Sequence, residues 1–118
     1  MASRGAGARQ KGAQFERDMA NYLSEHTGIE FKRGLAQSRG GGGEVADVTT
    51  SATLPKPLHF ELKRQKRCNI KGAYHQAQDD SIKEAIRVIV TKEDREDTLV
   101  TMELEQWLEF FKCWLAKS

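Results

Sequence analysis

Hydrophobic and polar residues along this chain follow two periods, one typical of helices and one typical of strands. Apolar residues recur at helical spacing early in the chain and predict a helix over residues 12–26 with one buried stripe. Residues 58–63 alternate strictly between apolar and polar side chains, as a half-buried strand does. The stripe of the first helix consists of Phe15, Met19, Tyr22 and Leu23. The other expected elements are strands at residues 29–33, 45–50, 86–91 and 98–102, a helix at 72–85 and a last helix from Glu103.

The last expected helix is rich in large apolar residues. Its main stripe consists of Leu104, Trp107, Leu108, Phe111 and Leu115. Phe110 and Trp114 extend this stripe sideways, beyond the area that covers one face of a small sheet. Two interpretations are open, namely an aromatic-rich core or a surface that covers a partner chain. In the second interpretation, Phe110 and Trp114 lie at or near a two-fold interface.

The length of 118 residues fits one domain. Residues 1–11 are rich in Gly, Ala, Ser and Arg and contain no acid, so we expect a flexible basic arm before a single domain at 12–118. A mitochondrial transit peptide has a similar composition, but no amphipathic pattern develops here. No apolar run is long enough to span a membrane, and Cys68 and Cys113 lack the spacing of a metal or redox motif. We therefore expect free thiols, a reducing cytoplasmic location and no membrane partner.

An aspartate and a glutamate on neighbouring expected strands give the strongest chemical signal. Asp47 lies on the strand at 45–50, and Glu61 and Lys63 share the polar face of the next strand. A turn between these strands would form a hairpin that brings Asp47 close to Glu61. Two adjacent carboxylates bind a hard divalent cation, and a lysine beside them orients a water or neutralises a phosphate. The plainer interpretation is a solvated strand face on which Glu61 and Lys63 form an ion pair.

Two other sets of polar residues permit both a structural and a functional interpretation. Glu16 borders the apolar stripe of the first helix, so that either its stem covers the stripe or its carboxylate points at a site. A zinc site could be imagined from His59, Cys68 and His75, but their spacing fits no standard zinc pattern. A surface position for His75 is the favoured interpretation.

Glycines and cations gather at two places. Residues 34–44 contain Arg39 followed by four glycines, which suits a loose hairpin loop or a backbone that approaches a phosphate. Residues 63–67 hold four cations in a chain whose net charge is only +2. Such a run either forms a solvated face or contacts a polyanion.

The order of the elements resembles the PD-(D/E)XK nuclease superfamily, with one acid on the first helix, one on the second strand and Glu-x-Lys on the third. The chain is most similar there to small archaeal-type and phage Holliday junction resolvases and related phage endonucleases, over residues 11–102. The segments that carry the resemblance are Lys11–Asp18, Ala46–Val48, Phe60–Lys63 and Ala73–Ala77. The family pattern often has proline before the aspartate, where this chain has Ala46. The implied fold is α/β, with a restriction-endonuclease-like mixed central sheet of about five strands flanked by helices.

The resemblance also implies a metal site. Asp47 and Glu61 would be the metal ligands, and the backbone carbonyl of Leu62 would supply a further oxygen. Lys63 would position the attacking water. Mg²⁺ is the expected cofactor, with Mn²⁺ able to substitute, because oxygen ligands suit both ions.

Further residues receive supporting roles from the same resemblance. Glu16 would be an accessory ligand or hold a water, and Gln76 would orient Lys63 or the nucleophile. The cations expected to follow the DNA backbone are Arg4, Arg9, Lys11, Arg33, Arg39, Arg64, Lys66 and Arg67.

The implied activity is metal-dependent hydrolysis of DNA phosphodiester bonds by an endonuclease. We expect a resolvase of Holliday junctions or other branched DNA, serving recombination and repair. A homodimer is expected because a four-way junction has two-fold symmetry. The alternatives are a less structure-selective phage nuclease of the same superfamily and an inactive DNA-binding or dimerisation module. Because Asp47, Glu61 and Lys63 are all present, the inactive module is disfavoured.

Overall fold

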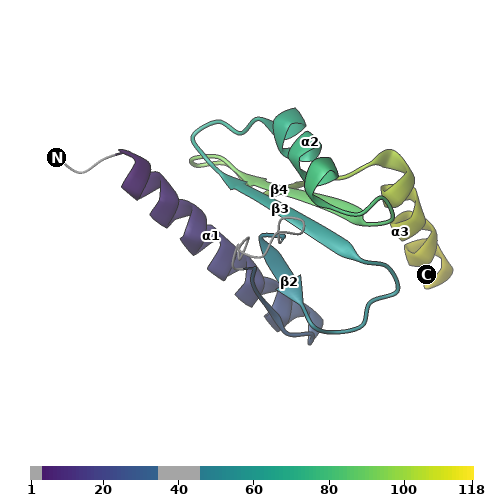
Figure 1. Ribbon diagram of the computed structural model, residues 1–118. Coiled ribbons are helices and arrows are strands. Elements are labelled where there is room, and N and C mark those ends of the chain that lie inside the picture. The colour runs from purple at the N-terminus through teal and green to yellow at the C-terminus, as the bar shows by residue number, and fades with distance from the viewer. Residues whose placement is uncertain (1–3, 35–45) are drawn as a thin grey trace.

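A computed structural model describes residues 4–34 and 46–118 of the chain (Figure 1). Within these residues the elements follow the expected order α-β-β-β-α-β-β-α, which confirms the α/β fold class. The helices are α1 (Arg4–Thr27), α2 (Ile70–Asp80) and α3 (Leu104–Ala116). The strands are β1 (Phe31–Arg33), β2 (Val48–Thr50), β3 (Leu58–Arg64), β4 (Ile86–Lys92) and β5 (Leu99–Thr101).

The strands in the described residues form two sheets and not the expected single sheet. One sheet pairs β1 with β2, and the other has the order β3-β4-β5, with β3 parallel and β5 antiparallel to β4. No ladder joins β2 to β3 in the described chain, so the expected hairpin is wrong. A backbone hydrogen bond of 3.0 Å from the N–H of Asp47 to the carbonyl of Phe60 connects the two sheets. The connection between β2 and β3 contains Pro55 and Pro57, which cannot donate ladder hydrogen bonds.

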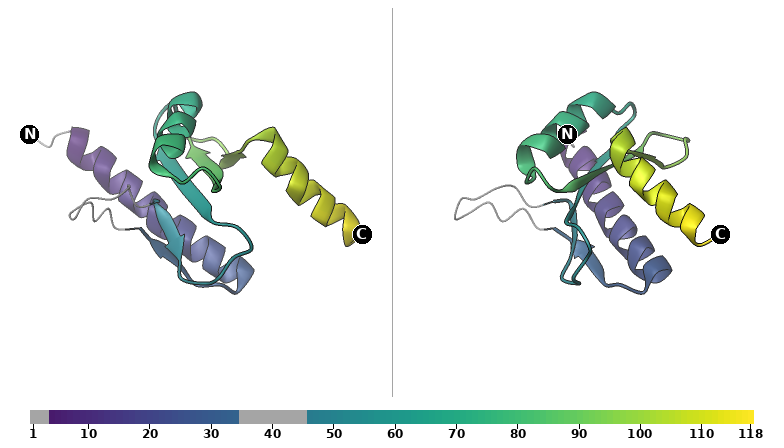
Figure 2. Two further views of the ribbon diagram at one scale, coloured as in Figure 1. Left: turned by 45° about the vertical axis from the view of Figure 1, so that its right-hand side comes forward. Right: turned by 90° about the vertical axis from the view of Figure 1, so that its right-hand side faces the viewer.

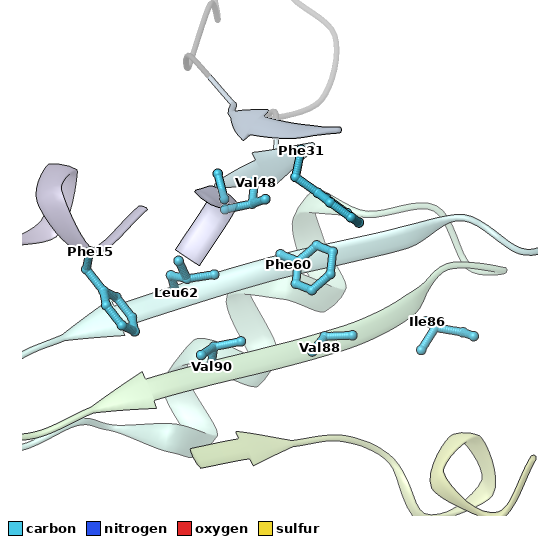
Figure 3. Packing of buried hydrophobic residues seen from close by; sticks show 9 residues of the cluster. Phe15, Phe31, Val48, Phe60, Leu62, Ile86, Val88 and Val90 are labelled. Carbon is cyan, nitrogen blue, oxygen red and sulfur yellow. The ribbon is translucent and has the colours of Figure 1, made fainter. Parts of the chain in front are cut away.

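The main core lies between α1 and one face of β3 and β4. Phe15 of α1 is buried there, and Phe31 meets Phe60 edge to face with ring centroids 5.9 Å apart. The labelled core residues in Figure 3 are Phe15, Phe31, Val48, Phe60, Leu62, Ile86, Val88 and Val90. Tyr22 departs from the expected buried stripe, because it is 58% exposed and packs against His26 at the surface.

Helix α2 covers the other face of β3 and β4. Its buried residues Ala73 and Ala77 pack with Ile89 of β4, which lies opposite Glu61 in the register. Small side chains let the helix approach the sheet closely, so the polar face of β3 is covered at His59 and Glu61, while the Lys63 side chain stays partly exposed. The expected half-buried strand is therefore wrong, and His59 and Glu61 are both buried.

Two helices have different bounds from those expected. Helix α1 begins at Arg4, so it includes most of the segment expected as a flexible arm; Ala, Arg, Gln and Lys in this stretch all favour helix. Helix α2 begins at Ile70 because the side chain of Asn69 caps it, accepting a hydrogen bond from the N–H of Gly72. It ends before Ser81, whose backbone is extended.

Helix α3 projects away from the rest of the molecule (Figure 2). All of its residues are described, and none is buried. The interpretation of its aromatic residues as core is therefore wrong. Trp107, Phe111 and Trp114 stack along the helix, with successive ring centroids 5.0 and 5.7 Å apart. None of the helices in the described part of the chain is long and apolar enough to cross a bilayer.

Candidate active site

Asp47 is held against β3 by two hydrogen bonds. Besides the backbone bond to Phe60, its carboxylate Oδ2 accepts a hydrogen bond of 2.7 Å from the N–H of Leu62. Residues on a strand direct their N–H and carbonyl towards the same neighbour, so the carbonyl of Leu62 lies on the Asp47 side of β3. The carboxylate of Asp47 is thus fixed beside the Glu61-Leu62-Lys63 segment.

Glu61, Lys63 and Gln76 form a continuous row between β3 and α2. The Glu61 side chain is only 5% exposed, and its Oε2 lies 3.7 Å from Nζ of Lys63. The Lys63 ammonium donates a hydrogen bond of 3.0 Å to Oε1 of Gln76 on α2. One contact therefore ties the lysine to the helix that follows it, while its ammonium stays close to the carboxylate of Glu61.

Glu16 of α1 faces the same region. Its Oε1 accepts a hydrogen bond of 3.0 Å from Nε of Arg33 on β1. The carboxylate is also near enough to Asp47 to raise the pKa of that residue. The structure therefore places Glu16 near Asp47, and Glu16 forms an ion pair with Arg33.

Like charges and burial perturb Asp47. The pKa of its carboxyl is raised from 3.8 to about 6, first by burial and then by the carboxylates of Glu61 and Glu16. The hydrogen bond from Leu62 and the ammonium of Lys63 lower the pKa of Asp47, and they offset only part of this effect. The positive charge around Asp47 is thus too small to compensate its ionised carboxylate.

A hard divalent cation fits this arrangement. Among the side chains that the structure describes, no group of three or more His, Cys, Asp and Glu residues has a spacing that would hold a metal ion. Asp47 and Glu61, with the Leu62 carbonyl, instead provide an oxygen-only set of two carboxylates and one backbone group. Mg²⁺ commonly binds through one or two carboxylates while waters and substrate phosphates complete its shell. A cation there would also offset the burial and the carboxylate repulsion that raise the pKa of Asp47.

Several of the expected DNA-contacting cations gather where β3 and β4 end. Arg64 forms an ion pair of 2.7 Å with Asp94, and Nζ of Lys11 lies 3.6 Å from the same carboxylate. Lys66 and Arg67 are exposed and line a shallow hollow with residues 93–96. Arg9 is exposed on α1.

Other expected contacts fall outside what the structure describes. Arg39 and the glycine run of residues 40–43 lie in the undescribed segment between Gly34 and Ala46. Arg4 belongs to α1, but the structure does not describe its side chain.

A separate apolar groove of about 730 Å³ lies beside α1, on the sheet face opposite α2. Its apolar lining residues include Phe15, Met19, Tyr22, Val88 and Val100. Asp47, Glu61 and Lys63 do not line it. The groove lacks the chemistry of the carboxylates, so we assign the candidate active site to the carboxylates.

The sequence pattern gave no direct sign of two buried polar groups near the site. His59 is buried beside Glu61. Arg87 lies opposite His59 on β4, is 8% exposed and forms an ion pair of 3.6 Å with Glu103. Tyr74 donates a hydrogen bond to the same glutamate, which raises the pKa of Tyr74. The small residues of α2 are the sequence feature that could have indicated this burial, because a helix with an alanine face packs closely and buries the polar face of a strand.

Residues 7–117 match the family described as "Phage putative PDDEXK endonuclease". The chain belongs to this nuclease family. Comparison with curated proteins and with solved structures gives no match. PD-(D/E)XK nucleases generally use divalent metal ions, and a nuclease family implies DNA as the substrate of this endonuclease.

Proposed function

We propose that this endonuclease hydrolyses DNA phosphodiester bonds with Mg²⁺ held by Asp47, Glu61 and the Leu62 carbonyl. The observation that carries the proposal is the hydrogen bond from Leu62 to Asp47, which places one carboxylate beside the strand segment that carries the other. The raised pKa of Asp47 supports it, because a cation would compensate a carboxylate that is buried and lies near two others. When bound, the ion supplies Lewis-acid activation of the phosphate and of the attacking water.

The remaining residues of the site position the reactants. Lys63 orients the water and compensates charge that develops on the phosphate. Gln76 holds the Lys63 ammonium in place through their 3.0 Å hydrogen bond. Glu16 holds a further water or assists as an accessory ligand, and Arg33 fixes the Glu16 side chain.

The proposed substrate is branched DNA, with the four-way junction as the main form, in recombination and repair of phage DNA in the host cytoplasm. Arg9, Lys11, Arg64, Lys66 and Arg67 would follow the backbone of two arms without reading bases. Arg4, Arg33 and Arg39 complete the proposed set of cations. This assignment of substrate rests on the resemblance to the small resolvases.

A homodimer would match the two-fold symmetry of such a junction. The support is α3, a helix without buried residues on which Phe110 is 48% and Trp114 is 64% exposed. Exposed aromatic surface of this extent commonly marks an interaction site. A second copy that packs against α3 would cover it and place two active sites on one DNA molecule.

The experiment is cleavage of matched four-way junction, flap, duplex and single-stranded DNA in Mg²⁺. A junction resolvase cuts the junction fastest and on two symmetric strands. Similar rates on all four substrates would favour the less structure-selective phage nuclease. Binding to DNA without cleavage in Mg²⁺ or Mn²⁺ would favour the inactive module.

A further inference from the structure

His59 lies directly beside the proposed metal ligand Glu61. The two residues are separated by one position on β3, so their side chains share the face that α2 covers. The side chain of His59 is 8% exposed and that of Glu61 is 5% exposed. A polar pair so deeply buried requires partners within the protein.

The imidazole of His59 is oriented towards Glu61. Its Nε2 lies 3.5 Å from Oε1 of Glu61, a separation at which the two groups do not yet form a well-aligned hydrogen bond. Among the residues that the structure describes, this nitrogen is buried and has no hydrogen-bond partner. A buried polar atom without a partner is uncommon, and a functional role is one recognised reason for it.

The two oxygens of Glu61 face different groups. Oε1 is on the side of His59, whereas Oε2 lies 3.7 Å from the ammonium of Lys63. Lys63 is in turn hydrogen-bonded to Gln76. The carboxylate is therefore bracketed along the strand, with an imidazole on one side and the proposed water-positioning lysine on the other.

The buried guanidinium of Arg87 is engaged elsewhere. Arg87 lies opposite His59 on β4, and its Nε donates to Oγ of Ser81 at 2.9 Å. Its remaining nitrogens contact the carbonyl of Ile82 at 3.2 Å and the carboxylate of Glu103 at 3.6 Å. His59 is thus the group placed to act on Oε1 of Glu61.

We propose that His59 is a positioning residue of the endonuclease. The N–H at Nε2 donates to Oε1 of Glu61 and holds the carboxylate in the rotamer that presents Oε2 to the metal position and to Lys63. The inference rests on the proposed function of Glu61. A nitrogen that carries this proton cannot itself bind a metal, so His59 orients the ligand Glu61 and is not a ligand itself.

The first test measures Mn²⁺ affinity by calorimetry and the kcat and KM of DNA cleavage. His59→Phe keeps a ring but removes the donor, and His59→Gln returns an amide N–H of similar reach. His75→Phe is the matched control, because His75 is exposed on α2. We expect His59→Phe to weaken Mn²⁺ binding about 10-fold or more and to lower kcat with KM nearly unchanged, since partners that orient metal ligands have effects of this size. His59→Gln should recover most of the Mn²⁺ affinity and of kcat, and His75→Phe should match the wild type in both quantities.

The outcomes separate this inference from the proposed function. A wild-type protein that neither binds Mn²⁺ nor cleaves DNA overturns the proposed function and the role of His59 with it. If the wild-type protein binds Mn²⁺ and cleaves DNA, two results overturn only the role of His59. One is that His59→Phe matches the wild type in Mn²⁺ affinity and kcat. The other is that His59→Gln has no higher Mn²⁺ affinity and kcat than His59→Phe.

A second measurement needs no variant that could fail to fold. Long-range ¹H–¹⁵N correlation spectra of the wild-type protein at pH 8 report which imidazole nitrogen of His59 carries a proton. The proposal requires a proton on Nε2 and a shift of that resonance when Mg²⁺ is added. A bare Nε2, or a resonance that does not respond to Mg²⁺, contradicts it.

Discussion

The carboxylate of Asp47 accepts a 2.7 Å hydrogen bond from the backbone N–H of Leu62. Leu62 lies between Glu61 and Lys63, so this bond fixes the aspartate relative to both of them. The acid is thus positioned by a backbone group and not by a flexible side chain. Because the backbone of β3 is itself paired with β4 along its whole length, the distance between the two proposed metal ligands is set by the sheet.

The contact between Lys63 and Gln76 predicts a specific kinetic effect. Lys63→Ala should lower kcat by about 100-fold or more with little change in DNA affinity, because its proposed partner is the attacking water. Gln76→Ala should lower kcat by roughly 10-fold through loss of orientation of the lysine. Single-turnover cleavage and DNA binding would be measured for both variants and for the control Lys71→Ala, whose exposed lysine is also on α2. The effects of Lys63→Ala and Gln76→Ala should not add in the double variant; full additivity, or a loss of affinity as large as the loss of rate, would contradict the assignment.

The raised pKa of Asp47 predicts how the stability of the metal-free protein depends on pH. Folding raises this pKa, so the carboxyl contributes its full stability below about pH 4 and loses it as the pH rises through about 6. Asp47→Asn keeps an acceptor for the N–H of Leu62 but carries no charge. At pH 7.5 its free energy of unfolding should exceed that of wild type by about 1 to 2 kcal/mol, allowing for partial solvent screening.

Urea unfolding of both proteins in EDTA from pH 4 to 8 measures this difference. The advantage of Asp47→Asn should shrink as the pH falls towards 4, where wild-type Asp47 is protonated in the folded state and begins to be protonated in the unfolded state. A difference that does not change with pH, or a variant that is less stable at pH 7.5, would show that Asp47 is not under electrostatic strain.

The exposed cations after β3 should contact the DNA backbone. Arg67→Ala should weaken binding equally across DNA sequences. It should also reduce the slope of log affinity against log salt concentration by about one. Lys83→Ala is the matched control, since it precedes β4 and parallel β3 and β4 place it at the opposite end of the sheet. Binding isotherms at several salt concentrations measure both slopes. Equal slopes for Arg67→Ala and wild type would place Arg67 in solvent in the complex.

The exposed aromatic residues of α3 predict a homodimer. Phe110→Glu combined with Trp114→Glu should give a folded monomer that nicks one strand but resolves four-way junctions poorly, since buried aromatic anchors dominate interfaces. Analytical ultracentrifugation at micromolar concentration measures the assembly, and Glu105→Gln serves as a control on the same helix. A wild-type protein that sediments as a monomer would contradict the dimer.

Much of the fold and the candidate site could be predicted from local patterns. The strict alternation of residues 58–63 placed Glu61 and Lys63 on one face of a strand, and the structure has them there. The element order followed from periodicity and turn residues. These features depend on neighbours in sequence, and side-chain chemistry specifies them directly.

Features that depend on what covers a surface could not be predicted in the same way. Alternation says that His59 and Glu61 share a face, but the packing of α2 decides that this face is buried. The ion pair between Arg33 and Glu16 and the separation of the strands into two sheets depend on contacts distant in sequence. The aromatic residues of α3 suited a core or an interface equally well, and only the position of the helix excluded the core.

The central claim is that Asp47 and Glu61 hold the metal ion for DNA cleavage. The most direct measurement is the rate of cleavage of a supercoiled plasmid with an inverted repeat, which offers both duplex DNA and an extruded four-way junction. Wild-type protein should cleave it in Mg²⁺ and stop in EDTA. Asp47→Asn and Glu61→Gln should each remain folded and lose about 100-fold or more in rate, whereas the exposed-acid control Asp79→Asn should cleave like wild type. Cleavage at the wild-type rate by either Asp47→Asn or Glu61→Gln in Mg²⁺, or undiminished cleavage in EDTA, would contradict the account.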